Sequence, residues 1–318
     1  MKLLDFEKYF PDEESCKTRF KKIRLEKGIV CPHCGCTHHY WKSDKEVFQC
    51  KKCGYRQSLK ANTVLHGSHL SFRTWFIAMH LLTATKHTFS AAELQRQLGM
   101  KRYQPVWELL HKLRNVMGER DFEYDLKGEI ELDEAFFTTE RPKDKKDELL
   151  KQGSGSERKA KVLVMVESTN IDKPKNGKKK KAIGHVKMLV IPDLKGETIF
   201  KNASSHIAAD ADLTMDASHA HSLLEKYYKH KVSRMNTQKD VDENLPWVHV
   251  MISNAKSMLL DTYHGIKAEY LQDYLNKFCY KFNRRSLSDR IFDRLLDICA
   301  GYQNGFEHRI YNKKSALP

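Results

Sequence analysis

Two cysteine pairs near the N-terminus have the spacing of a metal site. Cys31 with Cys34, and Cys50 with Cys53, each follow the order CxxC, and residues 35–49 separate the pairs. A CxxC turn presents two thiolates, and four thiolates complete the tetrahedral shell that Zn²⁺ prefers. A closed shell leaves no position for a substrate, so we predict a structural zinc rather than a catalytic one. The alternative is four free buried cysteines. The same segment also carries spare donors: His33, Cys36, His38 and His39.

A second set of candidate ligands is acidic. The alternating segment EIELDEAFF (129–137) predicts a strand with Glu129, Glu131 and Asp133 on one face. Acidic side chains on a central strand destabilise the fold unless a bound cation or water compensates their charge. Asp216 ends the segment HIAADADLTMD, immediately before a predicted helix. Carboxylates at strand ends can bridge divalent cations that activate an attacking oxygen in phosphoryl transfer. For either Asp alone, a turn or a helix cap is the alternative.

Two amphipathic helices follow the cysteine-rich segment. FSAAELQRQLGM (89–100) and YQPVWELLHKLRNVMGER (103–120) each carry an apolar face, with Gly99 in the turn between them. Ser90 is placed to cap the first helix, with Glu93 three residues later as in a capping box. In a helix-turn-helix, the start of the second helix meets base edges and phosphates. The predicted DNA contacts are therefore Lys101, Arg102, Tyr103 and Gln104. An ordinary helical hairpin in a core is the alternative.

The order of the remaining elements indicates a mixed α/β domain. Residues 1–30 carry a helical pattern interrupted by Pro11, and short ribbon-like runs surround the cysteine pairs. Beyond residue 127, strands over 129–137, 161–168 and 185–194 can form a meander. A further strand then leads into a helix over 219–230, and helices are predicted over 252–260, 268–282 and 288–302. Strands followed by helices in this order predict an α/β fold.

The composition favours a polyanionic partner. The chain has 318 residues, of which 40% are hydrophobic and 31% are charged, and its formal net charge is +15. Bound Lys and Arg release the counterions condensed on phosphate backbones, so a chain with a pI near 9.3 suits nucleic acid. A solvated basic surface and a ribosome-associated protein are the alternatives. No apolar run is long enough to span a membrane and no secretory signal is evident, so we expect no membrane partner.

Four segments together carry a family resemblance. They are GEIELDEAFF (128–137), GSGSERKAKVLVMVES (153–168), LTMDASHAHSLLEKYY (213–228) and the long run from HVMISNAK to FNRR (249–285). They resemble the catalytic domain of bacterial insertion-sequence DDE transposases, in the branch with an N-terminal zinc ribbon that is often called ISXO-like. The resemblance runs from about residue 20 to residue 285, and the cysteine motif and FNRR are its most specific parts. It implies a ribonuclease-H-like fold, Mg²⁺ dependence with Mn²⁺ as an alternative, and cleavage and joining of transposon ends.

The resemblance also assigns the catalytic positions. The first two acids fall on Asp133 and Asp216, which would hold the Mg²⁺. The third position departs from the usual Glu: the segment ISNAK carries Asn254 and Lys256, a pattern that part of the family is similar to. A neutral Asn carbonyl binds a cation less strongly than a carboxylate, and Lys256 could hold a DNA phosphate. The fallback ligands are Asp261 for the third position, and Asp210 and Asp212 for Asp216.

The expected architecture is an α/β fold in which a ribonuclease-H-like catalytic domain follows a zinc ribbon and a helix-turn-helix domain. We expect an N-terminal helix and zinc ribbon over 1–62, a helix-turn-helix domain over 63–122, a catalytic domain over 123–290, and a C-terminal helix and tail over 291–318. The expected function is a transposase that binds insertion-sequence ends and transfers strands by a two-metal mechanism. A non-catalytic DNA-binding regulator and a degenerate transposase are the alternative functions. The expected partners are transposon ends, target DNA and further copies in a homodimer or larger synaptic complex, in the bacterial cytoplasm at the nucleoid.

Overall fold

The fold is taken from a computed structural model of the whole chain. It describes residues 1–85, 88–140, 156, 158–170, 181–228, 232–235, 245–263 and 265–301. The chain divides into two compact units, which we call the N-terminal unit (Met1–Met117 with Leu287–Pro318) and the sheet unit (Gly118–Ser286). None of the described helices is both long enough and apolar enough to cross a membrane.

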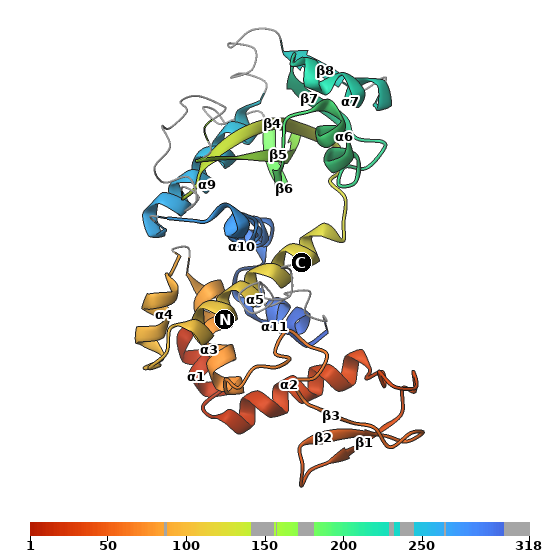
Figure 1. Cartoon of the computed structure of the whole chain (residues 1–318), viewed down its shortest axis with the longest axis vertical. Helices are drawn as coiled ribbons and strands as arrows, with labels where there is room; N and C mark the ends of the chain where they lie inside the picture. The colour runs from red at the N-terminus through yellow and green to blue at the C-terminus, as the bar shows by residue number, and fades with distance from the viewer. Residues whose placement is uncertain are drawn as a thin grey trace, which may run out of the picture. The chain divides into compact units, whose positions relative to one another are not determined.

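The N-terminal unit combines helices with a small antiparallel sheet (Figure 1). Its elements are α1 (Leu3–Tyr9), α2 (Glu13–Lys27), β1 (His39–Lys42), β2 (Val47–Cys50), β3 (Arg56–Ser58), α3 (Phe72–Ala84), α4 (Ala91–Gln97), most of α5 (Gln104–Phe122) and α11 (Ile291–Gly301). The three short strands pair in the order β1-β2-β3.

The last described helix, α11, returns to the start of the chain. Phe292 of α11 is buried, and its ring lies 5.7 Å from those of Phe6 and Phe10 and 6.0 Å from that of Phe76. The backbone N–H of Val64 also donates to the carbonyl of Cys299 at 3.2 Å. Packing of this aromatic cluster therefore makes α11 part of the N-terminal unit, although the chain that precedes it belongs to the other unit.

The sheet unit carries the larger sheet. Its elements are β4 (Glu129–Thr138), β5 (Lys159–Asn170), β6 (Lys181–Ile191), α6 (Gly196–Ser204), β7 (Asp212–Asp216), η3 (His219–His221), α7 (Ser222–Tyr227), β8 (Val232–Met235), α9 (Pro246–Thr262), η4 (Ala268–Tyr270) and α10 (Leu271–Asn283), with η5 (Arg285–Arg290) crossing to the N-terminal unit. The sequence did not predict α6, and α9 begins at Pro246 rather than near residue 252.

The strand order confirms the ribonuclease-H-like expectation. The order is β6-β5-β4-β7-β8: the first three strands form an antiparallel meander, and β7 and β8 then add in parallel beside β4. The central strand is thus the first one of the domain. Since a parallel connection needs a crossover, α6 and the segment around it carry the chain from β6 across to β7.

Each face of the sheet is covered by its own helices (Figure 1). Ala135 and Phe137 of β4 pack with Val164 of β5 against α9 and α10. On the opposite face, Ile130 and Leu132 pack against α6 and α7. This alternation follows from the period of two along a strand, and it fixes which acidic side chains of β4 face α9.

Two amide side chains of α10 pair with the sheet edge formed by β6. Gln272 accepts a hydrogen bond from the N–H of Val190 (2.7 Å) and donates one to the carbonyl of Met188 (2.9 Å). Asn283, at the end of α10, does the same with the N–H (2.8 Å) and carbonyl (3.0 Å) of Val186. The two amides therefore occupy backbone groups that an edge strand would otherwise offer to a further strand.

The FNRR motif (282–285) contacts this edge of the sheet. Besides its pairing with β6, Asn283 donates to Asp121 Oδ2 at 3.0 Å, and Arg284 forms a buried ion pair with Asp121 Oδ1 at 2.5 Å. Arg285 donates to the carbonyls of Ile183 and Gly184. The motif ties α10 to β6 and to the end of α5, so its part in the molecule is structural.

We predict that Asn283→Ala destabilises the protein. The substitution leaves the N–H and carbonyl of Val186 and the carboxylate of Asp121 without their amide partner in a buried place. Unsatisfied buried polar groups cost about 1–3 kcal/mol each, so the free energy of unfolding should fall by at least about 2 kcal/mol. Urea unfolding followed by circular dichroism measures this. Asn254→Ala, at an exposed position of α9, is the control and should change little; equal losses in both variants would contradict the prediction.

Candidate functional site

Asp133 and Asp216 lie on neighbouring parallel strands. β7 pairs with β4 such that Glu131 is level with Thr214. Continued by two residues, the same register brings Asp133 level with Asp216, on strands that run about 4.8 Å apart. The register of the strand pairs that precede them thus aligns two carboxylates that lie far apart in the sequence.

Both carboxylates leave the same face of the sheet. Asp133 alternates with Ala135 and Phe137, which pack under α9 and α10. Met215 packs into the opposite layer with α6 and α7, so the next residue, Asp216, is directed to the face of α9. Adjacent strands and a shared face are what two ligands of one cation need.

The surroundings of Asp133 concentrate negative charge. Burial raises the pKa of Asp133 to about 6, and the carboxylates of Glu134 and Asp216 act in the same direction. A hydrogen bond from the N–H of Glu134 to Asp133 Oδ1 (2.8 Å) and the nearby ring of His249 act in the opposite direction. A divalent cation would relieve this crowding, because it favours the charged form of each carboxylate.

His221 links Asp216 to a third carboxylate. Its ring is fully buried, with Nε2 2.8 Å from Glu134 Oε1 and Nδ1 3.0 Å from Asp216 Oδ1. Burial opposes the imidazolium, but the two carboxylates outweigh it and raise the pKa of His221. The N–H of Ser218 donates to the same Asp216 Oδ1 at 3.1 Å. These contacts orient Asp216 through Oδ1 and leave Oδ2 as the candidate cation ligand.

Glu131 has a different role from Asp133, although both lie on one face of β4. Its side chain is fully buried, and Oε2 accepts hydrogen bonds from the N–H groups of Trp247 (2.7 Å) and Val248 (2.9 Å). These amides belong to the first turn of α9, where the positive end of the helix dipole stabilises an anion. Glu131 thus fixes the start of α9 beside β4 through Oε2, whereas its buried Oε1 has no hydrogen-bond partner among the described residues.

One stripe of α9 faces Asp133 across a groove of about 560 Å³. The stripe consists of His249, Ile252 and Lys256, spaced by three and four residues as one face of a helix requires. The groove is lined by Asp133, Glu134, Ala135, Phe136, Phe137, Thr138, Lys159, His249, Ile252, Lys256, Leu259, Leu260, Tyr263 and Ile266. It combines an apolar floor with two lysines next to the carboxylates.

The structure does not bring Asn254 or Asp261 to this groove. Both are exposed, and neither lines the cavity. Residues five apart on an α-helix point about 140° apart, so the side chains of Asn254 and His249 leave different sides of α9. Of the two residues predicted from ISNAK, Lys256 reaches the groove, with Nζ 5.7 Å from the centre of the Phe137 ring.

The two fallback positions for Asp216 lie at or before the start of β7, away from the level of Asp133. Asp212 begins β7 level with Glu129, and Asp210 precedes the strand. Both are exposed. Asp216, at the other end of β7, is the acid level with Asp133.

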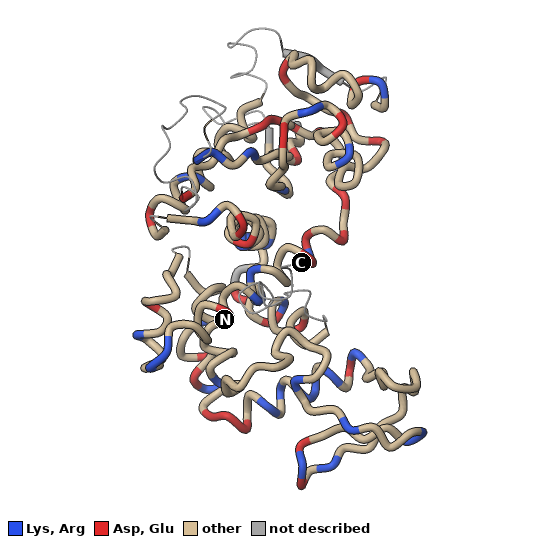
Figure 2. Tube along the Cα trace, viewed as in Figure 1, with Lys and Arg blue, Asp and Glu red and all other residues tan. Residues whose placement is uncertain are grey.

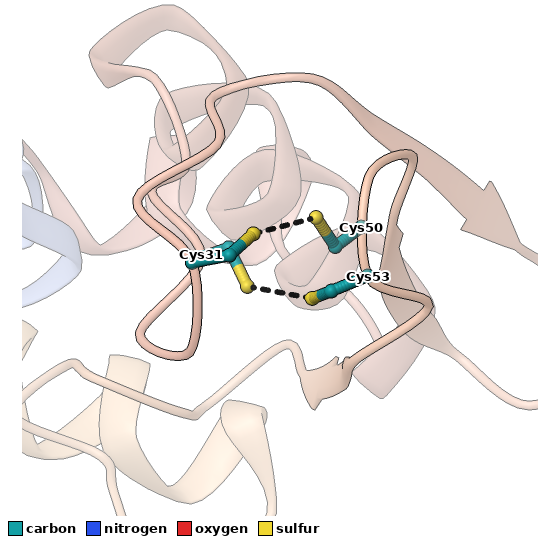
Figure 3. A group of neighbouring side chains, drawn as sticks. Cys31, Cys50 and Cys53 are labelled. Atoms are coloured by element: carbon teal, nitrogen blue, oxygen red, sulfur yellow. Dashed lines mark hydrogen bonds between the residues drawn. The ribbon is translucent and has the colours of Figure 1, made fainter.

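The four cysteines of the predicted zinc site converge in the N-terminal unit. Their sulfur atoms all lie within 4.8 Å of one another, with Cys31 to Cys53 and Cys34 to Cys50 each at 3.6 Å. Figure 3 shows the sulfur atoms of Cys31, Cys50 and Cys53 directed at one another from two turns. Four sulfurs, each about 2.3 Å from a tetrahedral Zn²⁺, would stand about 3.8 Å apart, so the donor set fits zinc.

Backbone hydrogen bonds favour the thiolate form of Cys50, whereas burial and the neighbouring thiols raise the pKa of Cys34 and Cys53. Hydrogen bonds from the N–H groups of Cys53 and Lys52 lower the pKa of Cys50 to about 6. Gly35 and Gly54 follow the two turns with φ of +70° and +72°, a conformation that glycine adopts without strain. Among the described residues, these four cysteines are the group of three or more potential ligands whose donor atoms converge in this way.

The helices α4 and α5 meet at the predicted turn. Ser90 Oγ accepts from the N–H of Glu93 at 3.0 Å, as predicted, but the Glu93 carboxylate pairs with Arg96 at 2.7 Å instead of closing a capping box. Gln95 Nε2 donates to the carbonyls of Met100 (3.0 Å) and Lys101 (3.3 Å). These bonds give the turn a defined shape.

The four predicted DNA contacts lie at this turn and the first residue of α5. Since α5 begins at Gln104, Lys101, Arg102 and Tyr103 precede the helix, and all three are exposed. Arg102 and Gln104 also line a cavity of about 370 Å³ beside residues 67–70. The side chains are therefore accessible and two of them share a pocket, a suitable arrangement for a ligand at the start of α5.

Two family models match the chain. The model described as "ISXO2-like transposase domain" matches residues 125–283, and the model described as "Transposase zinc-ribbon domain" matches residues 11–56. The first match contains the whole Asp133 groove, and the second contains all four cysteines. No curated protein matches the chain.

The solved structures that resemble the chain do so distantly. The pre-cleavage Mos1 transpososome is 10% identical, with 73% of this chain and 80% of that chain covered and a TM-score of 0.29. The Mos1 strand transfer complex is also 10% identical, with 73% and 79% covered and a TM-score of 0.25. The Mos1 transposase paired-end complex with left transposon end has the same identity, 72% and 79% coverage and a TM-score of 0.24.

We predict that Cys50→Ser abolishes stoichiometric zinc binding, because three thiolates no longer close the tetrahedral shell. Elemental analysis of the purified full-length protein measures this, and loss of zinc should also unfold the ribbon strands β1–β3. Cys36→Ser is the matched control: it removes a neighbouring sulfur outside the converging group and should keep zinc. A Cys50→Ser protein that keeps zinc, or a Cys36→Ser protein that loses it, would contradict the assignment of the four cysteines as the zinc ligands.

Proposed function

The chain belongs to the ISXO2-like transposase family, whose model matches half of it, and we propose that it cuts and joins the ends of its own insertion sequence with divalent cations held by Asp133 and Asp216. Mg²⁺ is the proposed physiological cation and Mn²⁺ a substitute. The proposal extends to a two-metal mechanism and to a structural Zn²⁺ on Cys31, Cys34, Cys50 and Cys53.

The observation that carries this proposal is the alignment of the two carboxylates. The parallel register of β4 and β7, continued by two residues, makes Asp133 and Asp216 level on one face of the sheet, and Asp133 lines the groove beside α9. The donor set fits a hard cation, because carboxylate oxygens are the ligands that Mg²⁺ prefers. A divalent cation bound there supplies the charge that activates the attacking oxygen and stabilises the leaving oxygen in phosphoryl transfer.

The residues around Asp133 and Asp216 position these carboxylates and offset their negative charge. His221 orients Asp216 and shares the charge of Glu134, while Glu131 holds α9 at the edge of the groove. Lys256 and Lys159 line the groove and would bind the phosphates on either side of the cleaved bond. Asn254 lies off this groove, so Lys256 is the residue of the predicted pair that we retain here.

The N-terminal unit supplies DNA binding in this proposal. Figure 2 shows Lys and Arg along α2 and the ribbon. The basic residues of the ribbon and its margins are Lys42, Lys45, Lys51, Lys52, Arg56 and Lys60. We propose that these contact the phosphate backbone, and that Lys101, Arg102, Tyr103 and Gln104 read the transposon end as in a helix-turn-helix.

The proposal includes an assembly and a place of action. Two ends must be joined, so we propose a homodimer or a larger synaptic complex that also captures target DNA. A bacterial protein with these substrates works in the cytoplasm at the nucleoid. We propose functional domains over 1–62, 63–122 and 123–290, with 291–318 completing the N-terminal unit through α11. A non-catalytic regulator is disfavoured, because it has no use for aligned carboxylates on the sheet.

We predict that Asp133→Asn and Asp216→Asn each abolish Mg²⁺-dependent nicking of a labelled transposon end. Each replaces a negative ligand by a neutral one, and two-metal chemistry contributes several kcal/mol, so the rate should fall by at least about 1,000-fold. A gel shift should show end binding nearly intact in both variants. Asp261→Asn is the control at an exposed carboxylate of α9 and should nick like the parent. Parental nicking by Asp133→Asn would refute the catalytic assignment.

We predict that a Lys101→Ala and Arg102→Ala double substitution weakens binding of the transposon end. Each phosphate contact that is lost should reduce the slope of log affinity against log salt by about 1. Fluorescence anisotropy at several salt concentrations measures both quantities. Lys8→Ala, which removes an exposed charge from α1, is the control and should leave the slope unchanged. If both proteins have the parental slope, the start of α5 does not contact phosphate.

A further inference from the structure

The N-terminal unit has a pocket beside the start of α5 to which the proposed function gives no ligand. Its volume is about 370 Å³, within the range of about 300–1,000 Å³ that is usual for small-molecule sites. Its lining comes from residues 67–70, from Trp75 of α3 and from the first turns of α5. Arg102 and Gln104, which are proposed to contact DNA, also belong to this lining. A group that projects from bound DNA at this place therefore has a cavity next to it.

Two oppositely charged side chains of α5 supply the pocket with hydrogen-bonding groups. Glu108 and Lys112 both line it, and residues four apart on a helix share a face with Cβ atoms about 5–6 Å apart. Gln104, one turn earlier, donates through Nε2 to Glu108 Oε1 at 3.0 Å and so orients the carboxylate. Lys112 is buried, and its Nζ donates to the carbonyl of His66 at 3.1 Å. A ligand in the pocket therefore meets an anionic acceptor beside a cationic donor.

The loop between β3 and α3 that lines the pocket is held in place by hydrogen bonds. Lys60 Nζ donates to the carbonyls of Ser68 (3.1 Å) and Leu70, and Trp75 Nε1 donates to Ser68 Oγ at 3.1 Å. Trp75 and Leu109 are both buried and add apolar surface to the lining. Apolar surface suits the face of an aromatic ring, and a lining that is already held needs little ordering when a ligand enters.

The charges of the lining favour a nucleotide over a bare anion. Arg102 is exposed, so its guanidinium can bind a phosphate at the surface. Glu108 is half-buried in the lining, and its carboxylate would repel a phosphate that entered the pocket. A nucleotide satisfies both conditions, because its base is uncharged and its phosphate can stay outside at Arg102.

Among the four bases, guanine matches the pair of Glu108 and Lys112. The Watson–Crick edge of guanine carries two adjacent donors, N1–H and the amino group, followed by the acceptor O6. A carboxylate can accept from both donors, and an ammonium group can donate to O6. Adenine, cytosine and thymine each carry one donor group on that edge, so they would give the carboxylate fewer hydrogen bonds. In a paired duplex cytosine occupies this edge, so the guanine that enters must be unpaired.

We propose that this pocket binds an unpaired guanine of the DNA held at the start of α5, with N1–H and the amino group on Glu108 and O6 on Lys112. This inference rests on the DNA binding in the proposed function. Unpairing and unstacking a base costs free energy, and the cost is least where the base is already unpaired. The pocket therefore favours DNA that presents an unpaired guanine over a fully paired duplex. A free guanine nucleotide offers the same edge, and the experiment separates the two sources.

The test compares guanosine with inosine, which lacks the amino group alone. A labelled transposon end carries one unpaired guanosine or inosine at each position in turn, and fluorescence anisotropy measures its affinity for the full-length, zinc-loaded protein. At the position that reaches the pocket, guanosine should bind at least about tenfold more tightly, because hydrogen bonds to a charged acceptor are the strong ones. Glu108→Gln should remove this preference, since an amide cannot accept from both donors. Glu26→Gln, which removes an equal charge from an exposed position of α2, is the control and should keep it.

A second variant separates recognition of the base from a structural effect. Lys112→Met removes the donor to O6 and keeps an unbranched apolar side chain. Inosine also carries O6, so both unpaired bases should bind at least about tenfold less tightly while the ratio of their affinities stays parental. A general loosening of the pocket would instead reduce that ratio together with the affinity.

The outcomes distinguish this inference from the proposed function. If the protein binds the paired end but does not prefer guanosine to inosine at any position, DNA binding stands and the guanine pocket is wrong. A preference that survives Glu108→Gln would also contradict the inference. If the protein does not bind end DNA, the proposed function itself fails. Calorimetric titration with guanosine and inosine monophosphates tests the other source: a Glu108-dependent preference for the free guanine nucleotide, with no gain from unpaired guanosine in DNA, would overturn the assignment to DNA.

Discussion

The hydrogen bonding of β7 alongside β4 is the constraint on which the candidate site depends. Asp133 and Asp216 come from strands far apart in the sequence, and the parallel register is what makes them level and directs them to one face. A shift of one residue would turn Asp216 to the α6 side and separate the pair, because side chains alternate along a strand. The crossover that delivers β7 is therefore as necessary to the chemistry as the carboxylates are.

Two other acidic residues near the site have specific partners of their own. Glu131 is stabilised by the N–H groups of α9, and Glu134 by His221. Each of these contacts has a second effect, because the first fixes α9 against the sheet and the second helps to orient Asp216. Asp133 remains half-buried beside other carboxylates, and desolvation and their negative charge raise its pKa, a condition that a divalent cation relieves.

Much of this arrangement could be predicted from the sequence, because the patterns that indicate it lie among neighbouring residues. The CxxC spacing, the alternation through 129–137 and the position of Asp216 at a strand end all depend on neighbouring residues. Helix α6 and strand β8 were not predicted, because a nine-residue helix and a four-residue edge strand carry little periodicity. His221 was also missed, because it acquires its significance from Glu134 and Asp216, its partners across the fold. Asn254 was favoured by family resemblance, whereas the direction of its side chain is set by how α9 packs.

The FNRR motif shows why a distinctive sequence need not be a catalytic one. It is among the most specific parts of the family resemblance, and in the structure Asn283 and Arg284 bind the backbone of β6 and the carboxylate of Asp121. The motif closes a sheet edge, and the hydrogen-bond geometry of that edge restricts which side chains can do so. It supports the site from a distance by holding α10, and with it the layer that α9 shares.

The measurement that tests the central claim most directly is an anomalous difference map from crystals of the full-length protein soaked with Mn²⁺. The account predicts a peak between the carboxylates of Asp133 and Asp216, on the face of the sheet that α9 covers. A peak elsewhere in the sheet unit, with none between these two side chains, would contradict it.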